Sequence, residues 1–185
     1  MNKHFLLTIS ICVIASISTS AQQPVFMKKD NVINLGVGIG GTLYSGYGHH
    51  SGVNRIPFLS VSFEHCIMDN LFDERSSLGV GGLVGYTSLR VPDVWTVSNI
   101  VIGARGALHY ALVDNLDTYA GLTIGYNIHS WKWIESSWGT STTGNSGLSY
   151  AFFAGARYYF TSAIAAFAEL GYGYSIINLG LSFRF

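Results

Sequence analysis

Residues 177–185 alternate strictly between large apolar residues and small or polar ones, and the run stops on a phenylalanine. Successive side chains of a β-strand point to opposite faces, so this period of two predicts a strand with one apolar and one polar face. The same pattern recurs along most of the chain, and no helical segment is available to cover the apolar faces. The remaining apolar solvent is lipid, and a sheet facing lipid must close on itself because lipid cannot satisfy backbone polar groups. The pattern therefore predicts an all-β transmembrane barrel.

Eight segments alternate in this way, which predicts an eight-stranded antiparallel up-and-down barrel. They are residues 32–44, 57–68, 77–89, 97–111, 118–130, 147–160, 164–174 and 177–185. Each segment can supply the roughly 9–11 residues that a tilted membrane strand needs. We assign the connections after the odd segments, residues 45–56, 90–96 and 131–146, to the outer side, because bacterial barrels carry long outer loops and short periplasmic turns.

Aromatic residues test this topology, because girdles of tyrosine, tryptophan and phenylalanine mark both edges of the apolar band of a membrane barrel. The outward-facing aromatic residues at the outer end are Tyr86, Tyr126, Tyr150, Tyr172 and Tyr174. Those at the periplasmic end are Phe63, Tyr110, Tyr158, Phe160, Phe183 and Phe185. The alternative is a soluble barrel of lipocalin type with its apolar face inside. It would put the charged residues on the opposite parity from the one that keeps them out of lipid.

The amino terminus resembles an export signal. Lys3 is followed by an apolar run over residues 5–17 and by small residues at 18–21, and the run falls short of the ~18 residues of a membrane-spanning helix. We expect a signal peptide at residues 1–21, cleaved after Ala21, and a single barrel domain at 22–185. The formal net charge is zero with 11% charged residues, which argues against nucleic acid as a partner. A mean hydropathy of +0.33 fits a barrel with its apolar face outward.

Most charges borne by the predicted strands fall on the inward face. They are Glu64, Arg105, Arg157, Glu169 and Arg184. Turns near Ser162 and Ser175 would place Glu169 between Arg157 and Arg184. Arginine pairs with carboxylate as a planar fork, and an unpaired charge in a dry lumen is costly, so a structural network of salt bridges is expected there. An ion path gated by these charges is the alternative, although eight strands enclose little more than their own side chains.

Residue types suited to catalysis are few. His49 and His50 lie in the first outer loop, and His129 lies at the outer end of its strand near Glu135. A serine, a histidine and an acidic residue at the outer leaflet could deacylate a lipid. No spacing holds such residues together, and adjacent histidines alone are not a ligand set for a metal. We therefore expect no enzyme activity, no cofactor and no metal site.

The glycine and aromatic alternation, the segment 58–65 with its inward Glu64, and the ending 178–185 resemble small outer-membrane β-barrel proteins of the OmpA/OmpX type. The resemblance implies location in the bacterial outer membrane, with outer-membrane lipid and the barrel-assembly machinery as partners. It also implies that the terminal residues Leu179, Leu181, Phe183 and Phe185 act as an assembly signal.

The longest outer connection carries Trp131, Trp133 and Trp138. Exposed tryptophans are common binding anchors, which favours a structural or surface-interaction role through the outer loops, with an extracellular ligand as partner. Trp131 and Trp133 could instead belong to the outer aromatic girdle. A narrow pore for small solutes or ions and an outer-leaflet lipid-modifying enzyme are the alternative functions.

Overall fold

The computed structural model describes residues 25–44, 53–135, 139–144 and 146–185. Its strands are β1 (Asn31–Ile39), β2 (Asn54–Asp69), β3 (Ser76–Val91), β4 (Trp95–Val113), β5 (Leu116–Glu135), β6 (Gly139–Gly144), β7 (Gly147–Tyr159), β8 (Ile164–Tyr172) and β9 (Ile177–Arg184). One short 3-10 turn, η1 (Thr42–Tyr44), is the helical element in this part of the chain. The expected signal peptide at residues 1–21 lies outside the described residues.

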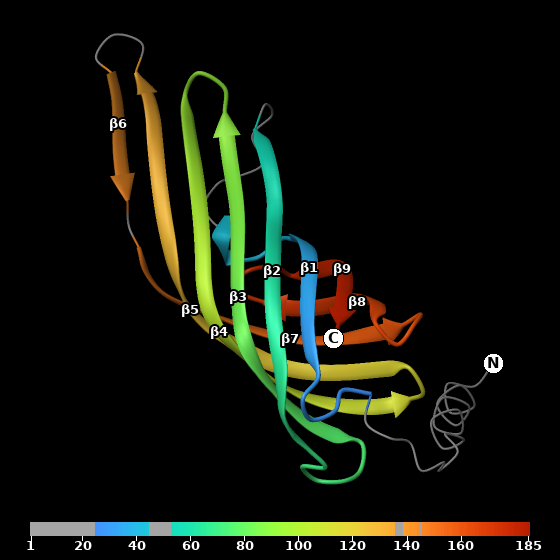
Figure 1. Cartoon of the computed structure of the whole chain (residues 1–185). Helices are drawn as coiled ribbons and strands as arrows, with labels where there is room; N and C mark the ends of the chain where they lie inside the picture. The colour runs from blue at the N-terminus through green and yellow to red at the C-terminus, as the bar shows by residue number, and fades with distance from the viewer. Residues whose placement is uncertain (1–24, 45–52, 136–138, 145) are drawn as a thin grey trace, which may run out of the picture.

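Eight of the strands close into an antiparallel barrel (Figure 1). Every consecutive pair among them is hydrogen-bonded, and β1 pairs with both β2 and β9, so the sheet has no free edge around the barrel. The short strand β6 pairs with β5 alone and stands outside the closed ring. The predicted closed barrel of eight antiparallel strands is therefore confirmed.

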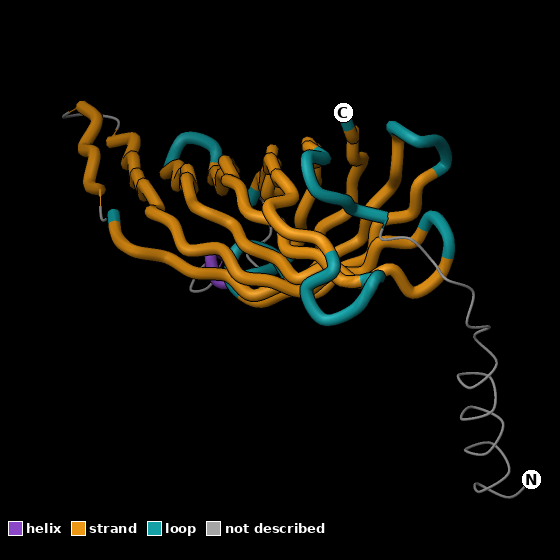
Figure 2. Tube along the Cα trace, turned by 60° about the horizontal axis from the view of Figure 1, so that its bottom comes forward, coloured by secondary structure: helices purple, strands orange, loops and turns teal. Residues whose placement is uncertain are grey.

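The barrel wall is much taller on one side than on the other. Strands β2 to β5 contain 16, 16, 19 and 20 residues, whereas β1, β8 and β9 contain 9, 9 and 8. The long strands continue beyond the short ones as a twisted sheet, with the β5–β6 hairpin at its far edge (Figures 1 and 2). We call this sheet the outer extension: residues 87–91, 95–99 and 128–135, together with β6.

Two expected boundaries are wrong. The connection at 131–146 is largely a hairpin, because β5 continues to Glu135 and residues 130–135 pair with β6, whose threonines suit an extended backbone. The first strand ends at Ile39 and not at residue 44. Gly40 and Gly41 follow with φ of 73° and 103°, values that favour glycine, and they turn the chain into η1.

Tyr174 is not part of the outer girdle. β8 ends at Tyr172, and Gly173 has a φ of 110°, which breaks the alternation of faces. Tyr174 consequently points inward, is 4% exposed, and packs with its ring 5.8 Å from that of Phe58. The other four outer tyrosines, Tyr86, Tyr126, Tyr150 and Tyr172, are exposed on the outward face as expected.

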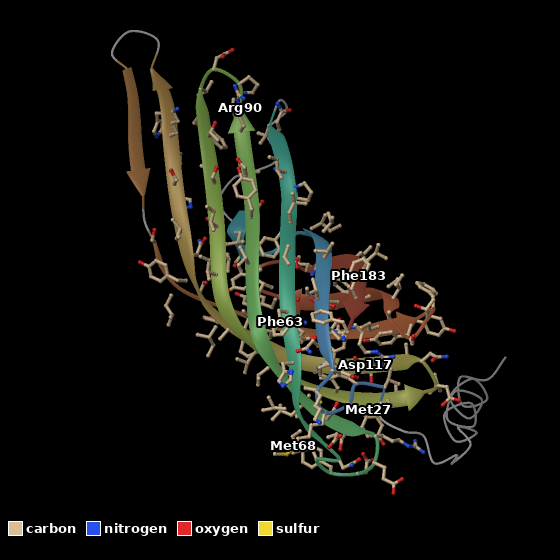
Figure 3. The ribbon with its side chains drawn as sticks, in the orientation of Figure 1. Met27, Phe63, Met68, Arg90, Asp117 and Phe183 are labelled. Atoms are coloured by element: carbon tan, nitrogen blue, oxygen red, sulfur yellow. The ribbon has the colours of Figure 1, made fainter. Side chains whose placement is uncertain are left out.

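The outward face between the girdles is aliphatic and exposed. Its residues include Leu35, Val37, Val61, Val84, Ile102, Leu108, Leu122, Ile124, Leu170, Leu179 and Leu181. At the edge expected to face the periplasm, which we call the periplasmic edge, Phe63 and Phe183 flank the same residue of β1, Ile33, from its two neighbouring strands (Figure 3). An apolar surface this extensive is unsuited to water and fits the hydrocarbon of a membrane.

No helix among the described residues is long and apolar enough to cross a membrane.

Candidate functional site in the lumen and its outer mouth

The centre of the lumen is built around Glu64 of β2, whose side chain is 1% exposed. Its Oε1 accepts a hydrogen bond from Arg105 Nε at 2.9 Å, and its Oε2 accepts one from Arg157 Nη2 at 2.6 Å. Both arginines are buried. The carboxylate thus joins β4 and β7 from β2, and each guanidinium gains the charged partner that burial demands.

Glu169 of β8 extends this network toward the outer side. Its Oε1 accepts hydrogen bonds from Arg105 Nη2 at 2.5 Å and from the Tyr119 hydroxyl at 3.0 Å. Its Oε2 accepts one from Asn178 Nδ2 at 3.2 Å. The Arg105 guanidinium also lies 3.6 Å from the centre of the Phe153 ring, a cation–π contact that covers its face.

The expected position of Glu169 between Arg157 and Arg184 is wrong. Across the hairpins Glu169 lies opposite Gly155 and Asn178, whereas Arg157 lies opposite Phe167. A narrow lumen lets long side chains reach across it, and Arg157 contacts Glu64 on the opposite wall.

Arg184 lies outside the network, at the periplasmic end. It is six positions beyond Asn178 on β9, about 20 Å along the strand at ~3.3 Å per residue. Its Nη1 donates a hydrogen bond to the carbonyl oxygen of Val25 at 2.5 Å and lies 3.8 Å from Asp30 Oδ2.

Two residues of the network were missed by the sequence reasoning. Asp117 Oδ2 lies 3.4 Å from Arg157 Nη1, and Asp117 Oδ1 lies 3.0 Å from His109 Nδ1. We expected Asp117 in a turn, but β5 already begins at Leu116. The available signal was parity: Asp117 shares the inward face of its strand with Thr123, and His109 shares that of Arg105. Figure 3 shows Asp117 on the inner side of the lower barrel.

The segment 25–30 closes the periplasmic mouth. Phe26 is 1% exposed, packs with Val32 and Cys66, and places its ring 4.4 Å from that of His109. The backbone of the segment bonds to β2, where Lys29 N donates to Cys66 O at 3.3 Å and Cys66 N donates to Asp30 O at 3.0 Å. The charged centre is therefore covered from below by an apolar side chain.

The outer mouth holds a cavity of about 520 Å³, which we call the mouth cavity. It lies inside the outer ends of β4, β5, β7 and β8 and beside η1. Its lining residues are Thr42, Leu43, Asn99, Asn127, His129, Ser146, Gly147, Leu148, Ser149, Tyr150, Tyr172 and Tyr174. Beneath it lies a cavity of about 30 Å³, bounded by Arg105 and Glu169. The mouth cavity therefore has a floor.

Hydrogen bonds fix the polar groups of the mouth cavity. Asn99 Oδ1 accepts a bond from Asn127 Nδ2 at 3.1 Å and lies 2.9 Å from His129 Nδ1. Because a carbonyl oxygen can only accept, Nδ1 of His129 carries the proton and Nε2 of the neutral ring is an acceptor. The hydroxyls of Ser149 and Tyr174 bond to each other at 3.0 Å.

Tryptophans gather on the inner face of the outer extension. Trp131 and Trp133 follow Asn127 and His129 on one face of β5, and register places Trp95 beside Trp133. The Trp131 ring stacks on Trp133 at 5.5 Å and lies 6.0 Å from Trp95. Trp133 is 45% exposed. Trp131 and Trp133 therefore face away from the lipid side and do not belong to the girdle, while Trp138 lies outside the described residues.

The arrangement of His129 does not resemble a catalytic pair. Its ring bonds to an amide, and Glu135 lies six positions farther along β5, about 20 Å at ~3.3 Å per residue. His49 and His50 lie outside the described residues. Within the described part of the chain, no group of three or more histidine, cysteine, aspartate or glutamate side chains could hold a metal ion.

Several solved β-barrel structures share this fold. The N-terminal β-barrel domain of Pseudomonas aeruginosa OprF aligns with a TM-score of 0.51 and 17% identity, over 85% of this chain and 98% of that one. The attachment invasion locus protein Ail of Yersinia pestis aligns with a TM-score of 0.54 and 14% identity, over 86% of this chain and 100% of that one. Ail in complex with the heparin analogue sucrose octasulfate aligns with a TM-score of 0.52 and 11% identity, over 86% and 100% of the two chains.

No protein-family model matches the chain. No curated protein matches it either. The structural likeness shows the fold, a closed eight-stranded antiparallel β-barrel.

Proposed function

We propose that the chain is an integral protein of the bacterial outer membrane whose barrel presents a binding surface to the outside. The surface consists of the inner face of the outer extension and the mouth cavity beneath it. The barrel is a scaffold in this proposal and performs no chemistry. Its aliphatic band contacts outer-membrane lipid, and its terminal residues Leu179, Leu181, Phe183 and Phe185 serve the barrel-assembly machinery.

The observation that carries the proposal is the position of the tryptophans. In a barrel whose sheet only spans the membrane, tryptophans are most stable on the outward face, at the level of the membrane–water interface. Here Trp95, Trp131 and Trp133 lie on the opposite face, above the membrane part, and Trp133 is 45% exposed. Aromatic side chains grouped on a concave, partly exposed surface are typical anchors of binding sites.

Two further features support a binding scaffold over a pore. The ion pairs of Glu64 with Arg105 and Arg157 cross the lumen between β2 and the strands β4 and β7, and Phe26 lies below them. A solute would have to break these buried ion pairs to pass through the barrel. One of the proteins with the same fold, Ail, has been solved with a sugar derivative bound, and this supports ligand binding by such barrels.

The test compares cells that display the parent barrel with cells that display the Trp131→Ala, Trp133→Ala double variant. Adsorption is scored on surfaces coated with polysaccharide, serum protein or phospholipid. We expect cells with the parent barrel to adsorb to at least one of these surfaces much more strongly than empty-vector cells. Cells with the double variant should adsorb no more than empty-vector cells.

The control variant, Ser130→Ala with Lys132→Ala, changes the other face of the same strand and should retain adsorption. Heat-modified gel mobility confirms that all three barrels are folded. Equal adsorption by parent and tryptophan variant, or by parent and empty-vector cells, would refute the proposal.

A further inference from the structure

The mouth cavity has the dimensions of a ligand site. Its volume of about 520 Å³ falls within the range of about 300–1,000 Å³ that is typical of small-molecule sites. It opens toward the outside, and the ion pair of Arg105 and Glu169 closes it below. A molecule that enters therefore meets a floor and stays on the outer side.

The lining of the mouth cavity is polar and uncharged. Among the lining residues that the structure describes there is no lysine, arginine, aspartate or glutamate. A charged ligand would give up hydration without gaining a counter-charge, and an apolar ligand would strand the amide and hydroxyl groups. The cavity therefore suits a neutral ligand that carries many hydrogen-bonding groups.

The free hydrogen-bonding groups of the cavity suit hydroxyls. Asn127 Oδ1 is buried and has no hydrogen-bond partner among the described residues. Nε2 of His129 is a second acceptor in the neutral ring, whose Nδ1 donates to Asn99. The side chains of Asn127 and His129 line the cavity, where a ligand can offer them O–H or N–H donors, and the hydroxyls of Ser149 and Tyr174 close by can donate or accept.

Aromatic rings complete the site. Tyr174 lies in its wall, and Trp131 continues the face of β5 two residues beyond His129. Flat rings offer an apolar surface to the C–H face of a sugar ring while neighbouring polar groups bind its hydroxyls. We propose that the mouth cavity binds a neutral saccharide, an inference that rests on the proposed binding function and specifies its ligand class.

The saccharide could be free in solution or be the head group of a glycolipid in the outer leaflet. Tyr150 and Tyr172 belong both to the rim of the cavity and to the exposed outer girdle. A head group anchored in the bilayer therefore reaches the rim from the side, and a soluble sugar reaches it from above.

The test titrates the barrel in lipid nanodiscs with lactose, maltotriose, N,N′-diacetylchitobiose and sucrose, with sucrose octasulfate as the charged comparison. Tryptophan fluorescence and saturation-transfer NMR report binding. A second arm places lactosylceramide in the nanodisc. We expect saturable binding of at least one neutral sugar tighter than about 1 mM, and weaker binding of the sulfated one.

Two variants and a control locate the site. Asn127→Ala with His129→Ala removes the acceptors, and Gly147→Leu fills the cavity at a position where an added Cβ meets nothing within 4 Å. Each should weaken binding at least about tenfold. Ile128→Ala, on the outward face between the two acceptors, should leave it unchanged.

Each outcome of the titration bears on one of the two proposals. No binding of any neutral sugar in either arm, or binding that both cavity variants retain, would overturn the inference. Tighter binding of sucrose octasulfate would overturn it too. If these results occur while tryptophan-dependent adsorption of cells persists, the saccharide inference fails and the proposed binding function stands.

Discussion

Replacing Glu64 by alanine should destabilise the barrel more than any change at its surface. The substitution removes two buried ion pairs at once, with Arg105 at 2.9 Å and Arg157 at 2.6 Å. Each arginine then keeps one carboxylate, Glu169 for Arg105 and Asp117 for Arg157, the latter at 3.4 Å. Breaking a buried pair by removing one partner costs about 3–5 kcal/mol, and we expect a loss of stability in that range.

The pairing itself is tested by a double-mutant cycle. Glu64→Ala combined with Arg157→Met removes both charges of one pair and should recover part of the loss, with a coupling energy of about 1–3 kcal/mol. The control cycle joins Glu169→Ala with Arg184→Met. Glu169 of β8 lies opposite Asn178, six positions from Arg184 on β9, and the two side chains share no partner. This control cycle should be additive within about 0.5 kcal/mol.

Both cycles are measured by urea titration of the barrel in phospholipid vesicles, followed by tryptophan fluorescence and by the mobility of unheated samples on gels. The two readings must give the same midpoint for the free energies to be comparable. Additive effects of Glu64 and Arg157, or strong coupling between Glu169 and Arg184, would refute the network described above and would instead favour pairing along the hairpins.

Three other results are expected. Gly81→Ala should block assembly because its Cβ would collide with the carbonyl oxygen of Phe63, whereas Gly106→Ala, whose Cβ would have its nearest neighbour at 4.0 Å, should insert normally; equal yields of folded barrel on unheated gels would contradict this. Phe26→Ala should cost about 3–5 kcal/mol in urea titrations, while Met27→Ala, at a side chain 41% exposed, should stay within about 0.5 kcal/mol; equal losses would show that the segment 25–30 does not seal the mouth. Planar bilayers loaded with the purified barrel should show no discrete conductance steps, since buried ion pairs fill the lumen. Conductance steps whose size changes with Arg105→Ala would contradict this and would support the pore as the function.

The alternation of side chains was enough to predict the architecture, because a period of two and a requirement for closure in lipid leave few choices. The strand number followed from the count of alternating segments, the strand direction from the lengths of the connections, and the placement of Glu64 and Arg105 inside from parity. The ion-pair partners of these side chains could not be predicted. Parity states which face of the sheet a residue occupies, but not which side chain on the opposite wall it contacts. Glu64 and Arg157 are 93 positions apart, and only the closed geometry brings them together.

Two other features depended on local backbone geometry that alternation cannot reveal. The φ of 110° at Gly173 reverses the face of Tyr174 and converts an expected girdle residue into part of the cavity wall. The hairpin of β5 and β6 extends a segment that was expected to be a loop, and this puts Trp131 and Trp133 on the inner face. The mouth cavity was not predicted either. Its wall is assembled from four separate strands and η1, and alternation within one strand does not show which strands meet there.

The seal at the periplasmic end has a consequence for the order of folding. Arg184 holds the carbonyl of Val25 across 159 positions of the chain, and Asn31 exchanges backbone hydrogen bonds with Phe185. Contacts of such long separation form late, since the intervening chain must be ordered first. The bond of Arg184 to Val25 can therefore form only after β9 has joined β1, whereas the bonds of the segment to Cys66 need only β2. The Arg184–Val25 bond then marks closure of the ring, and resistance of the chain around Val25 to protease during refolding reports the last step of assembly.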